Sequence, residues 1–269
     1  MNRAYAVAGA LFFAGFSIGA GPIAIRLASN RAVYDVSLAH TSGGDVIAAH
    51  GRMAIEFRDT CDGWSTTQRL IADMTASDGM TNRTDFFVSA WESKDGRTMR
   101  FDIGDTHNGT TKGRQRGAAT LEAGGAGSAQ LAAGKPAQFA LPKGTQFPTE
   151  QTLAILHVAL RGGKTFKHIV FQGGGPSNLN FSTAAIGKAL APALLAADAR
   201  ADRNGLLRNV AAWPTLISFY PLAAQAESPD YEVATELYAN GVSGSMSLIY
   251  PTYTLRATLS RLEALAPHC

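Results

Sequence analysis

Residues 85–103 read DFFVSAWESKDGRTMRFDI, and this stretch decides the fold class. Over 98–103, apolar Met, Phe and Ile alternate with polar residues. A period of two places apolar side chains on one face of a strand and polar ones on the other. The turn residues Lys-Asp-Gly at 94–96 separate this strand from an apolar partner at 85–92. The stretch therefore predicts a hairpin with one dry and one wet face, which is typical of antiparallel sheet.

The same alternation recurs along most of the chain. Further strands are expected at 34–38, 52–58, 166–172, 231–239, 242–250 and 253–259. Asn240-Gly241 joins two of these strands and predicts a type I′ hairpin turn. Residues 113–135, rich in Gly and Ala, predict either a weak strand pair or an irregular surface loop. So many strands predict a mainly β fold, a long antiparallel sheet that hides its edges by curling toward a barrel.

Helical signals are few in this sequence. Leucines recur at helical spacing over 150–161, Thr149 is a candidate N-cap, and Gly162-Gly163 follow a basic last turn. These features predict one helix, which would fill part of a barrel. Residues 184–201 are rich in Ala and Leu and are interrupted by Pro192. They predict either a second short helix or a flexible excursion.

The N-terminus has the features of an export signal. A basic residue precedes an apolar run at 6–18, which has the length of a signal-peptide core and falls short of the roughly 20 residues of a membrane span. Small residues follow, so cleavage is expected after Ala20, with Ala24 as the second choice. An uncleaved anchor is the alternative. We expect residues 1–20 to be a signal peptide, and 31–269 to form a single β domain without a stable membrane span.

Cys61 and the terminal Cys269 are the only cysteines of the chain. Their spacing fits no zinc or redox motif, because those motifs place cysteines two to four residues apart. In an exported protein, two cysteines most naturally form one disulfide. Two free thiols or an intermolecular bridge are the alternatives.

Charge and motif spacing exclude several functional classes. The chain has 24 basic and 21 acidic residues, a net charge of +3, which is too weak for a protein built to bind nucleic acid. The six histidines lack metal-ligand spacing. The acidic pairs Glu56 with Asp59, and Asp102 with Asp105, lie on expected strand faces or turns, where nothing desolvates them for acid–base catalysis. We therefore expect no catalytic residues, no metal and no cofactor.

Five basic residues could form a positive patch for anionic lipid head groups or an acidic partner. They are Arg97, Arg100, Lys112, Arg114 and Arg116. A solvated sheet face explains these residues equally simply and is the preferred interpretation.

An ordered set of short motifs resembles the EipB-like proteins. The motifs are Tyr34-Asp35-Val36-Ser37-Leu38, His50-Gly51-Arg52-Met53, Cys61-Asp62-Gly63-Trp64, Leu141-Pro142 with Phe147-Pro148-Thr149, Trp213-Pro214, Asn240-Gly241-Val242, Leu262-Glu263 and Cys269. The resemblance spans about 31–269 and departs from the family pattern around 117–134 and 191–205.

The resemblance implies a fold and a location. EipB-like proteins are periplasmic cell-envelope proteins of Alphaproteobacteria, with a long sheet wound into an unclosed, spiral barrel. They are similar in shape to carriers of lipidated proteins. Their conserved disulfide matches Cys61 and Cys269. The resemblance thus implies a periplasmic protein of the same shape.

Together these features predict a non-enzymatic protein that supports cell-envelope integrity. It would bind a lipid, a lipidated chain or another envelope protein on its curved sheet, where concave apolar surface is the expected site. One alternative is a module for a protein partner, such as a periplasmic helical-repeat protein, without any lipid ligand. A hydrolase of envelope components is another. The sequence assigns no individual ligand-binding residue.

Overall fold

The structure is a computed structural model, which describes residues 24–132, 137–224 and 226–267. The expected signal peptide at 1–20 and the terminal Cys269 lie outside the described residues. The first strands are β1 (Asn30–Thr41), β2 (Val46–Asp59), β3 (Gly63–Ala76), β4 (Thr81–Ser93), β5 (Thr98–His107), β6 (Thr110–Leu121), β7 (Gly127–Leu131) and β8 (Ala137–Leu141). The later strands are β9 (Thr145–Gln146), β10 (Thr165–Phe171), β11 (Leu179–Ile186), β12 (Ala212–Pro221), β13 (Tyr231–Tyr238), β14 (Ser243–Ile249) and β15 (Tyr253–Ala264). The helices are α1 (Pro148–Leu160), α2 (Ala196–Ala201) and the 3₁₀ turns η1 (Pro176–Asn178), η2 (Pro192–Leu195) and η3 (Leu222–Ala224).

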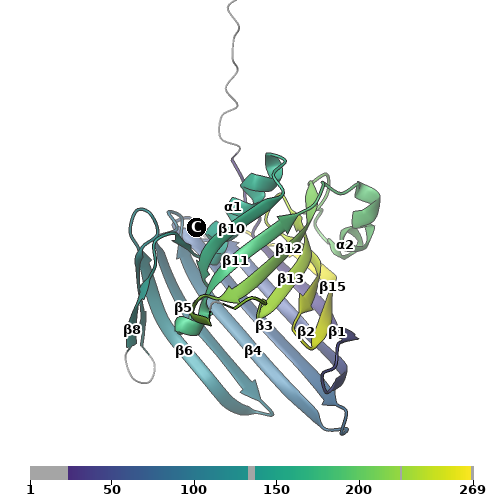
Figure 1. Ribbon diagram of the computed structural model, residues 1–269. Helices are drawn as coiled ribbons and strands as arrows, with labels where there is room; N and C mark the ends of the chain where they lie inside the picture. Colours follow the sequence, from purple (N-terminus) through teal and green to yellow (C-terminus); the bar gives the residue numbers. More distant parts are fainter. Residues whose placement is uncertain (1–23, 133–136, 225, 268–269) are drawn as a thin grey trace, which may run out of the picture.

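All the described strands belong to one sheet, whose order is β8-β7-β6-β5-β4-β3-β2-β1-β15-β14-β13-β12-β11-β10-β9. Neighbours are antiparallel except β9 and β10. The first and last strands pair in the middle of the sheet, so β8 and β9, consecutive in sequence, lie at its two edges. The sheet curls into a nearly closed barrel with one unsealed seam between these edges (Figure 1). This confirms the predicted mainly β, unclosed barrel.

Side chains pack across the seam that the strands leave open. The Phe171 ring of β10 meets Phe139 of β8 and Phe101 of β5 edge to face, with centroids 5.8 and 5.7 Å apart. The Gly144 N–H also donates to the Gly124 carbonyl, at 2.9 Å. Strand β8 ends where Pro142 has no N–H to continue a ladder. The seam is therefore closed by side-chain packing and a few backbone hydrogen bonds, without strand pairing between β8 and β9.

The alternation seen in the sequence produces the inward face of the barrel. Tyr34 and Val36 of β1 are 1% and 3% exposed, and they pair with inward positions on both neighbouring strands. Met53 of β2 and Ala257 of β15 are as deeply buried. The Tyr34 hydroxyl donates to the Ser243 carbonyl at 2.8 Å, which satisfies the one polar atom of this buried ring.

Helix α1 packs its apolar face on the C-terminal strands. Ile155 and Leu156, 1% and 0% exposed, belong to a cluster with Ile186 of β11 and Trp213 of β12. The helix was expected here, but Thr149 is not its N-cap. The residue before Pro148 occupies that position, because the fixed φ of proline suits the first helical residue.

The Asn240-Gly241 turn differs from the predicted type I′ turn. Gly241 has a φ of 81°, whereas a type I′ turn needs a positive φ at both central residues. The Gly241 N–H donates to the Tyr238 carbonyl, giving a three-residue loop with a glycine in the left-handed region. The Asn240 side chain explains the difference, because it donates to the Leu206 carbonyl and accepts from the Val242 N–H.

The two ambiguous segments are resolved by their neighbours. Residues 113–135 form most of β6 and all of β7, so the strand pair was correct. In 184–201, residues up to Ile186 complete β11, and only the part from Pro192 onward is helical. Alanine-rich sequence carries no polar alternation, so it could not distinguish strand from helix there. Within the described ranges, no helix has the length and apolarity needed to cross a membrane.

Candidate functional site

Several inward side chains of the barrel are only half-buried. Strands β2, β3 and β4 have 14, 14 and 13 residues, whereas β10, β11 and β14 have 7, 8 and 7. The long strands consequently extend beyond the short ones (Figure 1). Among the inward positions of β3, β4 and β5, Leu70, Phe86 and Ile103 are half-buried, unlike Met53 of β2, which is 1% exposed.

Aromatic residues continue this partly exposed surface on the C-terminal strands. Phe219 stacks on Tyr231 with ring centroids 4.6 Å apart, and Tyr250 and Tyr253 follow with spacings of 6.3 and 4.9 Å. Burial raises the pKa of Tyr250 to about 12 and that of Tyr231 further, so both hydroxyls stay protonated at neutral pH. We call the half-buried set the inner apolar surface: Leu70, Met74, Phe86, Val88, Ile103, Tyr231, Leu248, Tyr250 and Tyr253.

A glycine-rich loop after β10 contacts side chains of β5 and β6. Gly173, with a φ of 87°, lies so close to Phe101 and Ile103 that an added Cβ would be 3.0 Å from each. The Gly175 N–H donates to Gln115 Oε1 of β6 at 2.8 Å. The loop therefore lies between the packed seam and the half-exposed residues of β3 to β5.

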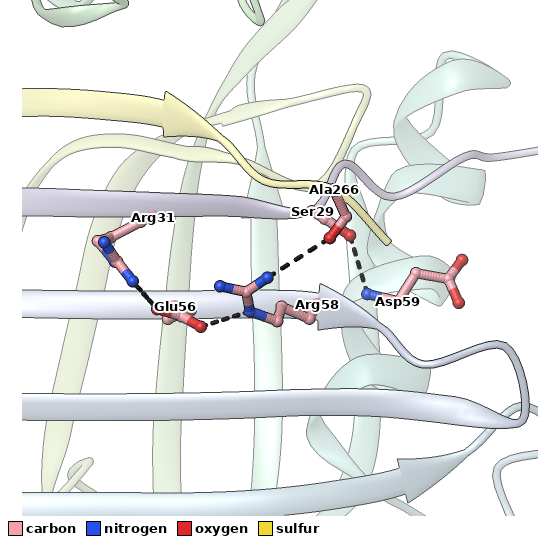
Figure 2. A network of polar contacts seen from close by, with 6 residues as sticks. All are labelled: Ser29, Arg31, Glu56, Arg58, Asp59 and Ala266. Atoms are coloured by element: carbon pink, nitrogen blue, oxygen red, sulfur yellow. Dashed lines mark hydrogen bonds and ion pairs between the residues drawn. The ribbon is translucent and has the colours of Figure 1, made fainter. Parts of the chain in front are cut away.

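The predicted cysteine site lies at the end of β2. Cys61 is exposed, has a φ of 67°, and its N–H donates to Asp59 Oδ1 at 2.9 Å. An L-residue rarely adopts this left-handed conformation, and the Asp59 carboxylate supports the turn that requires it. The Asp59 N–H in turn donates to Ser29 Oγ at 2.9 Å (Figure 2).

The chain's end lies beside this turn. Figure 2 shows Arg58, whose Nη1 donates to the Ala266 carbonyl at 3.4 Å. Arg58 precedes Cys61 by three residues, and Ala266 precedes Cys269 by three. The structure thus brings Ala266 beside Arg58, while the Cys61–Cys269 bond stays a prediction because Cys269 lies outside the described residues.

The first acidic pair considered for catalysis is occupied by basic partners. Glu56 accepts from Arg31 and Arg58 at 2.7 and 2.5 Å, and the Arg58 bond is the main cause that lowers the pKa of Glu56. Asp59 lies 2.7 Å from Lys94, whose hydrogen bond lowers the pKa of Asp59. Both carboxylates are therefore held ionised, the opposite of what a general acid needs.

The second acidic pair is split between faces. Asp102 points outward and binds Arg114 and Arg116 at 2.7 and 2.6 Å, and the Arg114 bond is the main cause that lowers the pKa of Asp102. Asp105, three residues along the strand, lies on the other face. The basic patch proposed from the sequence is thus partly neutralised by Asp102, as expected of a solvated sheet face. Within the described residues, no cluster of three or more His, Cys, Asp or Glu could hold a metal ion.

Two buried carboxylates were missed by the sequence analysis. Glu92 of β4 is 3% exposed and accepts from the Thr149 N–H and hydroxyl, both at 2.9 Å. Burial raises the pKa of Glu92 to about 7. Asp198 of α2 is 4% exposed and accepts from the Ser245 N–H and hydroxyl at 3.1 and 2.8 Å. Glu92 occupies an inward position in the alternating pattern of its strand, so its burial could have been predicted from the sequence. No sequence pattern indicated the burial of Asp198.

Comparison with known proteins agrees with this architecture. The chain is 28% identical over 268 residues to the cell envelope integrity protein EipB of Brucella abortus (strain 2308), covering 97% of this chain and 93% of that protein. It also superposes with a TM-score of 0.83 on a solved beta-barrel-like protein of a domain of unknown function from Brucella abortus. That match has 26% identity and covers 90% of this chain and all of the other. A family model described as EipB-like matches residues 22–266, and the chain therefore belongs to the EipB-like family.

Proposed function

We propose that this protein is a non-enzymatic periplasmic protein that supports cell-envelope integrity by binding an acyl chain. This acyl chain would belong to a lipid or a lipidated protein and would lie on the inner apolar surface. The observation that carries the proposal is the half-exposure of inward residues such as Leu70, Phe86 and Ile103. The Brucella abortus relative is a cell envelope integrity protein by name, which supports the envelope role.

The energetics of such a surface favour an acyl ligand. Each methylene removed from water contributes about 0.8 kcal/mol, so ten buried methylenes contribute on the order of 8 kcal/mol before the cost of association. The protonated hydroxyl of Tyr250 offers a hydrogen-bond donor beside the apolar side chains, whereas the hydroxyl of Tyr231 is already bonded to the Gln172 amide. The paired carboxylates Glu56 and Asp102 give a hydrolase no comparable support.

A matched pair of variants tests this proposal. Phe86 faces inward and Phe87 faces outward on the same strand, and both rings are half-buried. We expect lipid to be extracted from the purified protein, and a fluorescent fatty acid to bind the delipidated protein. Phe86→Gln should weaken that binding about tenfold, equivalent to about 1.4 kcal/mol, whereas Phe87→Gln should leave it unchanged.

The same experiment separates the acyl site from a lipid-free partner module. If no lipid co-purifies, the delipidated protein binds no fatty acid, and it still captures an envelope protein from extracts, the acyl proposal is wrong. Equal effects of Phe86→Gln and Phe87→Gln would also count against the inner apolar surface as the site.

A further inference from the structure

A second hollow lies on the opposite side of the sheet from the inner apolar surface. It has a volume of about 420 Å³ and opens over β11 to β15. Its floor is a row of paired outward positions that crosses five strands: Ala185, Leu216, Ala234, Ser247 and Arg256. Three of these five side chains are small, which leaves the space. We call this site the outer hollow.

Charged groups of both signs line the outer hollow. Glu236 of β13, Arg256 of β15 and Lys164, which precedes β10, all contribute to its wall. Within the described residues, none of the three forms an ion pair, and Arg256 makes one long hydrogen bond, 3.5 Å from Nη1 to Ser247 Oγ. Opposite charges therefore share one cavity without neutralising each other directly.

Glu236 carries the most specific signal. Its Oε2 atom is buried and has no hydrogen-bond partner among the described residues. Such an unsatisfied acceptor costs roughly 1–3 kcal/mol, so native structures usually supply a donor from protein, water or ligand. Burial and the nearby Asp198 carboxylate raise the pKa of Glu236, while Arg256 lowers it. The terminal torsion of a glutamate is broad, so a small rotation can turn this oxygen toward the hollow.

We infer that the outer hollow binds a small zwitterion, a molecule with a primary ammonium a few bonds from a phosphate or carboxylate. The ammonium would donate to Glu236, and the anionic group would be held by Arg256 and Lys164. The guanidinium fork of an arginine matches the oxygens of phosphate and carboxylate groups. A simple anion would be repelled by Glu236 and Asp198, and a simple cation by the two basic side chains. Phosphoethanolamine and free amino acids share the required chemistry.

The binding test uses O-phosphoethanolamine as the probe, titrated by calorimetry into the purified protein. We expect saturable binding, with phosphocholine at least tenfold weaker because its methyl groups replace the N–H donors. Inorganic phosphate and ethanolamine alone should also be at least tenfold weaker. Glycine and vesicles of phosphatidylethanolamine or phosphatidylcholine distinguish the sources: a free metabolite predicts glycine binding, and a lipid head group predicts selective binding to phosphatidylethanolamine vesicles.

Charge-removing variants locate the site. Glu236→Gln and Arg256→Gln should each weaken O-phosphoethanolamine binding at least tenfold, with thermal unfolding used to show that each variant is folded. Arg256 is exposed, so we expect the Arg256→Gln variant to fold. It therefore tests the site even if Glu236→Gln does not fold. The matched control is Glu232→Gln, which lies on the same outward face but outside the hollow, bound to Ser218 Oγ at 2.5 Å.

Several outcomes would overturn the inference. They are the absence of saturable binding, equally tight binding of phosphocholine or phosphate, or a loss with Glu232→Gln as large as with Glu236→Gln. Phe86→Gln should leave zwitterion binding unchanged, because Phe86 lies on the inward face of the sheet. The two proposals can therefore fail independently.

Discussion

At the scale of single residues, Glu92 shows how one buried side chain joins distant parts of the barrel. Its carboxylate comes from β4 and accepts two hydrogen bonds from Thr149 in the first turn of α1. The first N–H groups of a helix have no partner within the helix, so Glu92 supplies what a capping side chain would. The cost is a desolvated carboxyl group.

This cost predicts a pH dependence of stability. Burial raises the pKa of Glu92 from its ordinary 4.5 to about 7, so the folded protein binds an extra proton between these values. The stabilising contribution of Glu92 is therefore fully present below pH 4.5 and is lost as the pH rises through 7. Urea denaturation should show a free energy of unfolding that is lower at pH 8 than at pH 5, by an amount on the order of 3 kcal/mol. The Glu92→Gln variant should not show this difference.

Other carboxylates titrate in the same experiment, so the comparison of the two proteins is the informative quantity. Burial also raises the pKa of Glu150 and of Glu236, so their contributions change in the same direction as that of Glu92. These contributions are common to the wild-type protein and the Glu92→Gln variant and cancel in the difference. Identical pH dependence in the two proteins would show that Glu92 does not titrate in this range.

The residue scale also shows where sequence analysis stops. The helix at 150–161 was predictable from its leucines, but Thr149 was misassigned as N-cap, because its real partner lies 57 residues earlier in the chain. Asn240-Gly241 was correctly placed in a turn, and its type was wrong because Asn240 binds the Leu206 carbonyl, 34 residues earlier. Local patterns give the positions of elements, and long-range hydrogen bonds decide their details.

At the scale of elements, hydrogen bonds connect the end of β2 to both ends of the described chain, and we call this set of contacts the tether. Arg58 and Asp59 bind segments from both termini of the described chain, Ala266 and Ser29. A Cys61–Cys269 disulfide would close a loop of about 200 residues, for which the entropic model gives roughly 5 kcal/mol and measurements commonly give less. We expect Cys61→Ser to lower the free energy of unfolding by about 2–4 kcal/mol.

The measurement compares urea denaturation of the protein, purified without reductant, with and without dithiothreitol. Reduction should destabilise the wild-type protein about as much as the Cys61→Ser substitution does, and it should have no further effect on the variant. Rapid alkylation of both thiols in the untreated, natively folded protein would contradict the prediction.

The Phe171 ring packs across the seam between β8 and β10. Phe171 is fully buried between Phe139 and Phe101, which come from strands on the far side of the seam. Phe171→Ala should therefore lower the free energy of unfolding by about 3–5 kcal/mol, as expected for a large cavity. Phe181→Ala, on the outer face and 36% exposed, is the control and should cost much less in the same urea titration. Equal losses would mean that the seam is held by other contacts.

At the scale of the whole molecule, the sequence predicted the curled antiparallel sheet but not its strand order. Alternating residues such as Tyr34, Val36 and Leu255 identify inward faces, yet nothing in their pattern says which strand pairs with which. The pairing of β1 with β15 joins residues more than 210 positions apart. The inner apolar surface and the outer hollow could not be predicted from the sequence either. Each is formed by side chains from several strands, and only the strand pairing shows that these side chains are neighbours.

This topology makes the last strand essential to the whole barrel. β15 pairs with both β1 and β14, and its inward Leu255, Ala257, Leu259 and Leu262 are between 0% and 4% exposed. Without β15, the barrel would lose this apolar layer and expose two unpaired edges in its middle. A chain that ends at Tyr250 should therefore show no cooperative urea transition by circular dichroism. A chain that ends at Leu265 retains β15 and lacks only the tether, so it should unfold cooperatively at lower urea than the full chain. Cooperative unfolding of the shorter chain would instead mean that residues 24–250 fold as an independent unit, and that the central β1–β15 pairing is not what holds the barrel together.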